Sequence, residues 1–510
     1  MTTDHDKLAT STDAAPPASG DDRRPIVERE LFINNEWRAS STGETLSLVN
    51  PATEQPFGQA AAASVADVDR AVGAARTAFD SGPWPRLSMH ERATVLARFA
   101  DALEAEIEPL ATLVTMETGL PRKDSIGGTK AMTSVLRYYV DIVDEVELVE
   151  RRTGRTGVTA SMEKMPIGVV AQIVPWNSPI VMAAFNLPGA LLAGCTVVLK
   201  PSELTPLSAG YLADAALSAG LPPGVLNVIP AGPGASDALV RHPGVDKVAF
   251  TGSTPTGRKI AAAASPTLKH VSLELGGKAA ALVLDDAPLE RLVETLTPAI
   301  MFNNGQMCLQ PSRLLVPEQR KDEIVDALAK SFAGVVVGPP SAPDTEVGPL
   351  ISQKQYEHVM DMLRSAAADG GRFVIGGGRP DGMDTGFYVA PTIITDVSPD
   401  SRVATEEIFA PVLVVLTYRT EHEALEIVNR TEFGLNDAVY SADPERALRI
   451  ARQMQSGSIN INNGQYLDAA IPFGGVKQSG YGRELGPEGL DDYFETHVIY
   501  LDAEPFHGLG

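Results

Sequence analysis

The chain has 510 residues, more than one hydrophobic core ordinarily holds, so two or three packed units are expected. Hydrophobic residues make up 44% and charged residues 21% of the sequence, which excludes a disordered or fibrous chain. Acidic residues outnumber basic ones by 65 to 42, which gives a formal charge of −23. This balance argues against nucleic acid or a membrane surface as partner, because both require a positive protein surface.

Residues 1–25 are predicted to be a disordered leader, because they are polar and rich in Thr, Asp, Ala and Pro. They lack the apolar run of a secretory signal. The two cysteines, Cys195 and Cys308, are too few for a disulfide scaffold. We therefore expect a reducing compartment and a cytoplasmic location.

The first part of the chain shows helical periodicity over 66–79 and predicts a second helix over 87–115. The stretch between Lys164 and Lys200 has no charged residue and is long enough to cross a bilayer. Prolines at 166, 175, 179 and 188 divide it, however, so it is better explained as buried strands that flank a buried helix.

Short apolar strands alternate with helices after Lys164, which predicts βαβ units and parallel sheets. One series is expected at 169–174, 196–199, 226–229, 247–250 and 270–275, and a second at 313–316, 373–375, 412–416 and 458–461. The glycine pair at 276–277 marks the seam between them. The predicted fold is therefore α/β, with two doubly wound parallel-sheet units.

Two further segments, 145–165 and 495–501, alternate like strands outside both units. A strand of this kind is either an ordinary edge strand or one that pairs with a partner subunit.

Cys308 and Glu274 are candidates for covalent and acid–base chemistry. A single cysteine is often a small core residue, and Cys195 fits that description. Cys308 instead follows Asn303, Asn304 and Gly305, as expected where the backbone approaches a ligand, which makes it a candidate nucleophile. Glu274 ends an apolar strand, where partial burial raises the basicity of a carboxylate. A simple ion pair with Lys278 is the alternative.

Other polar groups also follow strand ends. Gly252, Ser253 and Gly257 form a glycine turn that leads into a helix, and such a turn suits a pyrophosphate or simply caps a helix. Lys200 and Glu203 are placed to bind ribose hydroxyls, or else form a solvated strand end. Asn177 offers an amide donor to an oxyanion. Neither paired histidines nor a Cys-x-x-Cys motif occurs at metal-ligand spacing, so no metal is predicted.

In combination, these segments resemble the NAD(P)-dependent aldehyde dehydrogenase superfamily from about Phe32 to Leu501. The resemblance rests on seven motifs in order: Pro175-Trp176-Asn177, Lys200-Pro201-Ser202-Glu203, Phe250-Thr251-Gly252-Ser253, Glu274-Leu275-Gly276-Gly277-Lys278, Gly305-Gln306-Met307-Cys308, Glu406-Glu407-Ile408-Phe409 and Pro472-Phe473-Gly474-Gly475.

The resemblance implies that Cys308 attacks an aldehyde and that Asn177 and the Cys308 N–H hold the oxyanion. Hydride transfer to NAD then leaves a thioester, which Glu274 hydrolyses through water. The NAD-binding residues it implies are Trp176, Lys200, Glu203, Gly252, Ser253, Gly257, Glu407 and Phe409. It further implies a homodimer or homotetramer and a cofactor-binding domain at 26–144 plus 167–273. The catalytic domain would span 274–484, and the oligomerisation strands 145–166 plus 485–510.

The chain departs from the family pattern at Asn186, where many members have a lysine that pairs with the glutamate matching Glu484 in a proton path. Gln310 and Pro311 also replace small residues after the nucleophile. The pocket positions implied by the resemblance are Met182, Phe185, Met307, Leu309, Leu467 and Phe473. They are apolar, so an aliphatic or aromatic aldehyde is expected rather than an anionic one.

Three alternatives remain. A CoA-acylating dehydrogenase passes the acyl group to CoA, but such relatives generally lack the base that Glu274 provides. A cysteine hydrolase needs a histidine partner for Cys308, and none is evident. A catalytically silent nucleotide-binding protein is disfavoured because Cys308, Glu274 and Asn177 are retained together.

Overall fold

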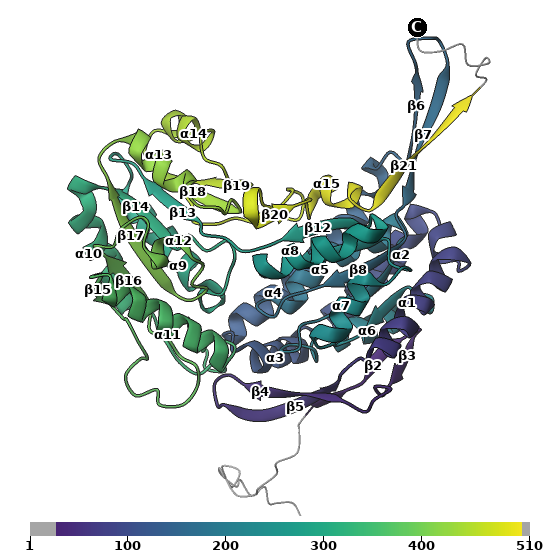
Figure 1. Cartoon of the computed structure of the whole chain (residues 1–510), viewed down its shortest axis with the longest axis horizontal. Helices are drawn as coiled ribbons and strands as arrows, with labels where there is room; N and C mark the ends of the chain where they lie inside the picture. The colour runs from purple at the N-terminus through teal and green to yellow at the C-terminus, as the bar shows by residue number, and fades with distance from the viewer. Residues whose placement is uncertain (1–26, 502–510) are drawn as a thin grey trace, which may run out of the picture.

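The computed structural model describes residues 27–501, and two large sheets form the body of the molecule (Figure 1). The first has the order β20-β12-β11-β8-β9-β10-β2-β3. Its central strands are parallel: β8 (Val169–Ile173), β9 (Thr196–Lys200), β10 (Leu226–Val228), β11 (Lys247–Thr251) and β12 (His270–Glu274). Antiparallel strands β20 (Gly480–Tyr481), β2 (Leu31–Ile33) and β3 (Glu36–Arg38) close its edges.

Two layers of helices cover this sheet, because the side chains of its strands are apolar on both faces. One layer contains α1 (Val65–Asp80), α7 (Pro233–Arg241) and α8 (Thr254–Ala264). The other contains α2 (Met89–Glu104), α3 (Ile107–Thr118), α4 (Arg122–Asp141), α5 (Pro179–Ala193) and α6 (Ala209–Ala219).

The second sheet has the order β15-β16-β17-β14-β13-β18-β19, and all its strands are parallel except β15. The strands are β13 (Ala280–Val283), β14 (Arg313–Pro317), β15 (Arg372–Ile375), β16 (Thr392–Thr395), β17 (Val412–Tyr418), β18 (Asn436–Tyr440) and β19 (Ser458–Ile461). Helices α9 (Leu289–Met301) and α10 (Lys321–Ala333) cover one face. Helices α11 (Gln353–Ala368), α12 (Arg402–Thr405), α13 (Glu421–Asn429) and α14 (Pro444–Ala451) cover the other. The predicted α/β fold with two doubly wound sheets is confirmed.

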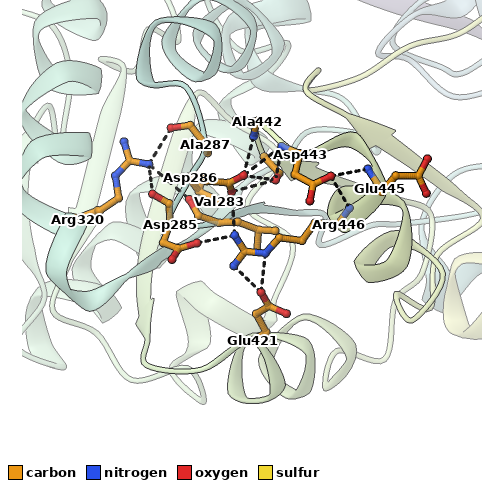
Figure 2. A network of polar contacts seen from close by, with 12 residues as sticks. Val283, Asp285, Asp286, Ala287, Arg320, Glu421, Ala442, Asp443, Glu445 and Arg446 are labelled. Carbon is orange, nitrogen blue, oxygen red and sulfur yellow. Dashed lines mark hydrogen bonds and ion pairs between the residues drawn. The ribbon is translucent and has the colours of Figure 1, made fainter.

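A polar network fixes one end of the second sheet (Figure 2). The Asp286 carboxylate, just after β13, accepts hydrogen bonds from the Ser441 hydroxyl and from the backbone N–H groups of Ala442 and Asp443. Arg446 on α14 pairs with Asp286 at 3.1 Å. The network therefore ties the end of β13 to the start of α14.

Two small sheets complete the fold. Strands β1 (Val27–Arg29), β4 (Thr45–Asn50) and β5 (Gln55–Ala61) form one of them. In the other, β21 (Phe494–Leu501) pairs with β7 (Thr159–Pro166), which pairs with β6 (Val149–Thr153). This second small sheet stands out from the body as an arm (Figure 1). The strands predicted at 145–165 and 495–501 are thus confirmed, and they pair with each other.

The prediction of one helix over 87–115 was wrong. Helix α2 ends at Glu104 and α3 begins at Ile107, because Pro109 has no N–H to continue the hydrogen-bond ladder of α2. The apolar stretch after Lys164 consists of β8, α5 and β9, as expected. Within residues 27–501 no helix has the length and apolarity needed to cross a membrane. The predicted leader at 1–25 lies outside the described residues.

Candidate active site

The C-terminal ends of neighbouring strands bring the predicted residues of the first sheet together. Asn177 follows β8, Ser253 follows β11, and Glu274 is the last residue of β12. Parallel neighbours end at one edge of a sheet, where α/β proteins bind their ligands. Cys308 reaches this edge from the loop between α9 and β14 of the second sheet.

A cavity of about 590 Å³ lies at this edge. Its lining includes most of the predicted catalytic and cofactor residues: Trp176, Asn177, Glu203, Gly252, Ser253, Glu274, Cys308, Glu407 and Phe409. Lys200 is not in this lining; it is buried, with Nζ 4.0 Å from the Glu203 carboxylate. Gly257 is also outside it, in α8, where a Cβ would meet the Leu275 side chain at 2.6 Å. Gly257 therefore lets α8 pack closely on the first sheet.

The loop that carries Cys308 is held in an unusual backbone conformation. Asn303, Asn304 and Gly305 have φ angles of 59°, 57° and 71°. The Asn304 side chain bridges two distant loops: its Nδ2 donates to the carbonyls of Gly119 and Pro349 at 3.0 and 2.9 Å. Asparagine tolerates left-handed φ, and these bonds stabilise it there. The two asparagines that flagged this loop in the sequence thus fix its shape.

Asn177 is locked against the same loop. Its Nδ2 donates to the Gln306 carbonyl at 2.8 Å, while the Asn303 amide donates to the Asn177 carbonyl at 2.8 Å. The same Nδ2 lies 3.9 Å from the Met307 Sδ, a weak acceptor, and Asn177 also lines the cavity, so its second amide hydrogen can turn to a ligand.

Cys308 is half-buried, and its thiol is not in a disulfide. Burial raises the pKa of the thiol well above its usual range, and the negative charges of Glu407 and Glu274 raise it further. A thiolate at this position therefore requires a base or a cationic ligand.

Glu274 lines the same cavity as Cys308. It is 3% exposed, and neither carboxylate oxygen has a partner within hydrogen-bond distance among residues 27–501. Burial raises the pKa of Glu274 well above its usual value, and the charge of Glu484 adds to the effect. The alternative, an ion pair with Lys278, does not form: that side-chain nitrogen is itself buried without a hydrogen-bond partner in the described part of the chain. A partly desolvated carboxylate beside a thiol is a competent proton acceptor.

Glu407 and Phe409 also line the cavity. Glu407 accepts a hydrogen bond from the Gly277 N–H at 3.0 Å, and burial raises its pKa to about 7. The Phe409 ring packs edge-on against Trp176 at 5.4 Å. Sequence reasoning missed the start of α11, which also lines this cavity with Ser352, Lys354, Gln355 and His358. Its available signal was Ser352, a helix N-cap.

A second cavity, of about 240 Å³, is lined by the predicted pocket residues Met182, Met307 and Leu467. Met182 lines both cavities, so it lies between them. The sequence reasoning missed Lys123 and Asp124, which also line the smaller cavity; burial raises the pKa of Asp124 to about 6.

Phe185, Leu309 and Phe473 line neither cavity and are buried in the core behind them. The Phe185 and Phe473 rings pack at 5.9 Å. Glu484 is buried as well, and Asn186 donates a hydrogen bond to it at 2.6 Å.

Comparison with known proteins gives a consistent result. A model described as the Aldehyde dehydrogenase family matches residues 37–499. Geranial dehydrogenase of Castellaniella defragrans is 43% identical over 477 residues, which cover 93% of this chain and 99% of that protein. Betaine aldehyde dehydrogenase of Atriplex hortensis is 38% identical, over 94% of this chain and 97% of that protein. The structure of a Mycobacterium tuberculosis aldehyde dehydrogenase complexed with NAD+ superposes with a TM-score of 0.91 at 40% identity, and covers 93% of this chain and 99% of that one.

Proposed function

Because the chain belongs to the aldehyde dehydrogenase family, as its motifs predicted, we propose that it oxidises an aldehyde to a carboxylic acid with NAD through covalent catalysis at Cys308. The observation that carries this proposal is the lining of one cavity by Cys308, Glu274 and Asn177 together with the residues predicted to bind NAD. The geranial and betaine aldehyde dehydrogenases among its relatives supply the precedent for the overall reaction, and the residue roles below are our proposal.

The residues around the larger cavity fit NAD. The N-terminus of α8, where Ser253 occupies the N-cap position without a side-chain capping hydrogen bond, has the positive dipole end that suits a pyrophosphate. Glu203 and Glu407 offer carboxylates to ribose hydroxyls, and Trp176 and Phe409 form an aromatic wall. When bound there, NAD supplies an acceptor for hydride from the substrate carbon.

Cys308 begins the reaction by losing its proton to Glu274 and attacking the aldehyde carbon. The second amide hydrogen of Asn177 and the Cys308 N–H then hold the oxyanion of the thiohemiacetal. After oxidation the acyl group remains on sulfur as a thioester. Glu274, once it has released the first proton, takes a proton from water as the water oxygen attacks the acyl carbon. The carbon–sulfur bond breaks, and the carboxylic acid leaves.

A panel of aldehydes, assayed by NADH absorbance with NAD and NADP in parallel, tests this function. We expect hexanal and benzaldehyde to give a higher kcat/KM than succinate semialdehyde, because Met182, Met307 and Leu467 make the smaller cavity apolar. The reverse order would contradict the proposed substrate class. A requirement for added CoA would instead support the acyl-CoA alternative, which Glu274 disfavours.

The decisive variant is Cys308→Ala. It should abolish NADH formation while NAD still binds, since the sulfur forms the covalent bond and the nucleotide contacts lie elsewhere on the cavity. Calorimetric titration with NAD measures binding, and Cys195→Ala is the matched control because Cys195 is fully buried away from the cavity. Retained oxidation by Cys308→Ala would refute the assigned nucleophile.

We also propose that the arm formed by β6, β7 and β21 joins subunits into a homo-oligomer. Its support is the set of apolar side chains exposed on these strands: Val149, Met165, Val498, Ile499 and Tyr500. A cytoplasmic location is proposed as well, because both cysteines are free and Cys308 must remain reduced to act.

A further inference from the structure

The segment between α12 and β17, residues 406–411, contains a strained residue that lines the larger cavity. Phe409 has a φ angle of 60°, in the left-handed region. This conformation is unfavourable for a bulky aromatic residue, and a simple turn would be served by glycine or asparagine. Backbone strain of this kind persists only where the surroundings hold it, and it is concentrated at functional sites. We therefore asked what holds Phe409.

Two side chains of α11 bind the backbone of this segment. Gln355 donates through Nε2 to the carbonyls of Ile408 at 3.2 Å and Phe409 at 3.0 Å. His358 lies three residues further along the same face of α11, and its Nε2 bonds to the Glu407 carbonyl at 3.2 Å. Because a carbonyl oxygen only accepts, Nε2 of His358 carries the hydrogen. Helix α11 thus holds three consecutive carbonyls.

The loop that carries the nucleophile holds the next carbonyl. Gln310, which is 4% exposed and two residues after Cys308, donates through Nε2 to the Ala410 carbonyl at 2.8 Å. The same nitrogen donates to the Ile300 carbonyl at 3.0 Å. Gly305 of this loop lies so close that a Cβ there would be 2.2 Å from the carbonyl carbon of Ala410. The strained segment and the Cys308 loop are therefore in direct contact.

Carbonyls 407 to 410 each accept a side-chain hydrogen bond, although the segment belongs to no helix or strand. The ring of Phe409, which this backbone directs, packs edge-on against Trp176 at 5.4 Å. Both rings line the cavity that Cys308 also lines. The hydrogen bonds to the segment therefore fix where the aromatic wall lies relative to the nucleophile.

We propose that these donors, Gln355 above all, are positioning residues that hold Phe409 in its left-handed conformation. They thereby fix the wall beside which the nicotinamide of NAD is held, so the inference rests on the proposed function. Without this hold, Phe409 relaxes to an ordinary φ angle and its ring moves. Oxidation of the carbon bound to Cys308 then slows, because hydride transfer depends on the distance and orientation of the two reactants. Acylation of Cys308 by an ester, which uses no NAD, is unaffected.

Gln355→Leu removes both donors and keeps a side chain of similar size. We expect the first turnover of NADH from hexanal, measured by stopped flow at saturating NAD, to slow by about 10- to 100-fold. The burst and steady release of p-nitrophenol from p-nitrophenyl acetate should keep their rates. Equal losses in the two assays would mean general damage to the site and would overturn the positioning role.

Gln353→Leu is the matched control. Gln353 is an exposed glutamine on the same helix, and its amide donates to Glu357 at 2.7 Å instead of to the strained segment. It is not among the residues that line the larger cavity. Both assays should give the rates of the unmodified enzyme.

A double-mutant cycle separates positioning from direct contact with NAD, since Gln355 itself lines the cavity. If Gln355 acts through Phe409, then Gln355→Leu slows the first turnover no further once Phe409→Ala is present. If it binds NAD independently, the two effects multiply. Multiplied effects would exclude Gln355 as a positioning residue for Phe409.

The position of the Phe409 ring can also be followed in the enzyme without NAD. Gln355→Leu should increase the quenching of Trp176 fluorescence by acrylamide, because the Phe409 ring no longer packs against it. Adding Trp176→Phe should abolish this increase, which assigns it to Trp176 among the three tryptophans. Unchanged quenching in Gln355→Leu would overturn the inference and leave covalent catalysis intact. NADH formation by Cys308→Ala would instead contradict the proposed function.

Discussion

At the scale of single residues, the burial of Glu274 defines its chemistry. Its charge raises the pKa of the Cys308 thiol, and the charge of Glu484 in turn raises the pKa of Glu274. Gly474 makes room for it, since a Cβ there would lie 2.7 Å from its Oε1. A raised pKa increases its affinity for a proton, which favours the general-base role during hydrolysis.

Glu274→Gln should therefore stall the enzyme at the thioester. At high pH, where the Cys308 thiol ionises without help, we expect a burst of NADH followed by turnover about 10²- to 10⁴-fold slower than normal. Stopped-flow absorbance measures both phases. Glu117→Gln is the control, because Glu117 is a buried glutamate with a pKa of about 7 that instead accepts the Leu207 N–H. A steady rate equal to that of the control would remove Glu274 from deacylation.

Glu203 is expected to set the choice between NAD and NADP. Its side chain is 47% exposed at the rim of the larger cavity, where a carboxylate repels an added 2′-phosphate. Glu203→Ala should reduce the ratio of kcat/KM with NAD to kcat/KM with NADP by about tenfold. This change corresponds to a free-energy difference of about 1.4 kcal/mol. Glu203→Gln, which keeps a hydrogen-bonding group, separates charge repulsion from ribose binding. An unchanged ratio in both variants would exclude Glu203 from cofactor choice.

At the scale of elements, the Asp286 network joins β13 to α14 (Figure 2). Asp286→Ala leaves the N–H groups of Ala442 and Asp443 without their acceptor, so we expect the free energy of unfolding to fall by about 1–2 kcal/mol. Chemical denaturation monitors this change. Asp285→Ala is the control: Asp285 is 59% exposed and pairs with Arg446, and its loss should cost less than about 1 kcal/mol.

The effect of Asp286→Ala should also depend on pH. Burial acts to raise the pKa of Asp286, but hydrogen bonds from Ser441 and Asp443 outweigh it and the pKa is lowered. A lowered pKa in the folded state means that the stabilisation is present above the unfolded pKa of about 4 and is lost as the pH falls through the folded value. The difference between the two proteins should thus shrink in acid.

The sequence located the continuous apolar strands of the first sheet but missed β13, β16 and β18 of the second. Strands such as β8 and β9 are continuous apolar runs, and both were located. Strand β18 was missed because it begins with Asn436 and Asp437, residues typical of turns. In the structure Asp437 is buried and accepts the Ala280 N–H at 2.6 Å, a contact between segments far apart in sequence. Local patterns do not contain such a contact.

The same limit applies to the site. Asn177, Ser253 and Glu274 could be grouped from sequence because parallel strands share an edge. The contribution of α11 could not, since Lys354 and His358 reach the cavity only through the packing of the second sheet beside the first. The resemblance placed Phe185 and Phe473 at the substrate, but depth within the core is set by the packing of whole helices and loops.

At the scale of the whole molecule, the arm is an unusual surface. Its three strands come from two segments far apart in sequence, 149–166 and 494–501, and β21 has a neighbour on one side only within the described chain. Val498 and Tyr500 share one face of β21 and are 42% and 69% exposed. An exposed apolar edge strand favours association with another copy. Its unpaired backbone groups can form hydrogen bonds with a strand of that copy, and its apolar side chains are removed from water in the contact.

Val498→Asp should therefore weaken the homo-oligomer. Burying the valine side chain contributes about 1.5–3 kcal/mol to association, and the variant loses this contribution. The aspartate also brings a charge into the contact, and burying that charge is unfavourable. We therefore expect at least a tenfold weaker association. Light scattering over a dilution series measures the distribution of masses. Leu268→Asp is the matched control, since Leu268 is an apolar residue 87% exposed on the turn after α8. If Val498→Asp and this control have equal masses at every dilution, the arm does not join subunits through the face that carries Val498.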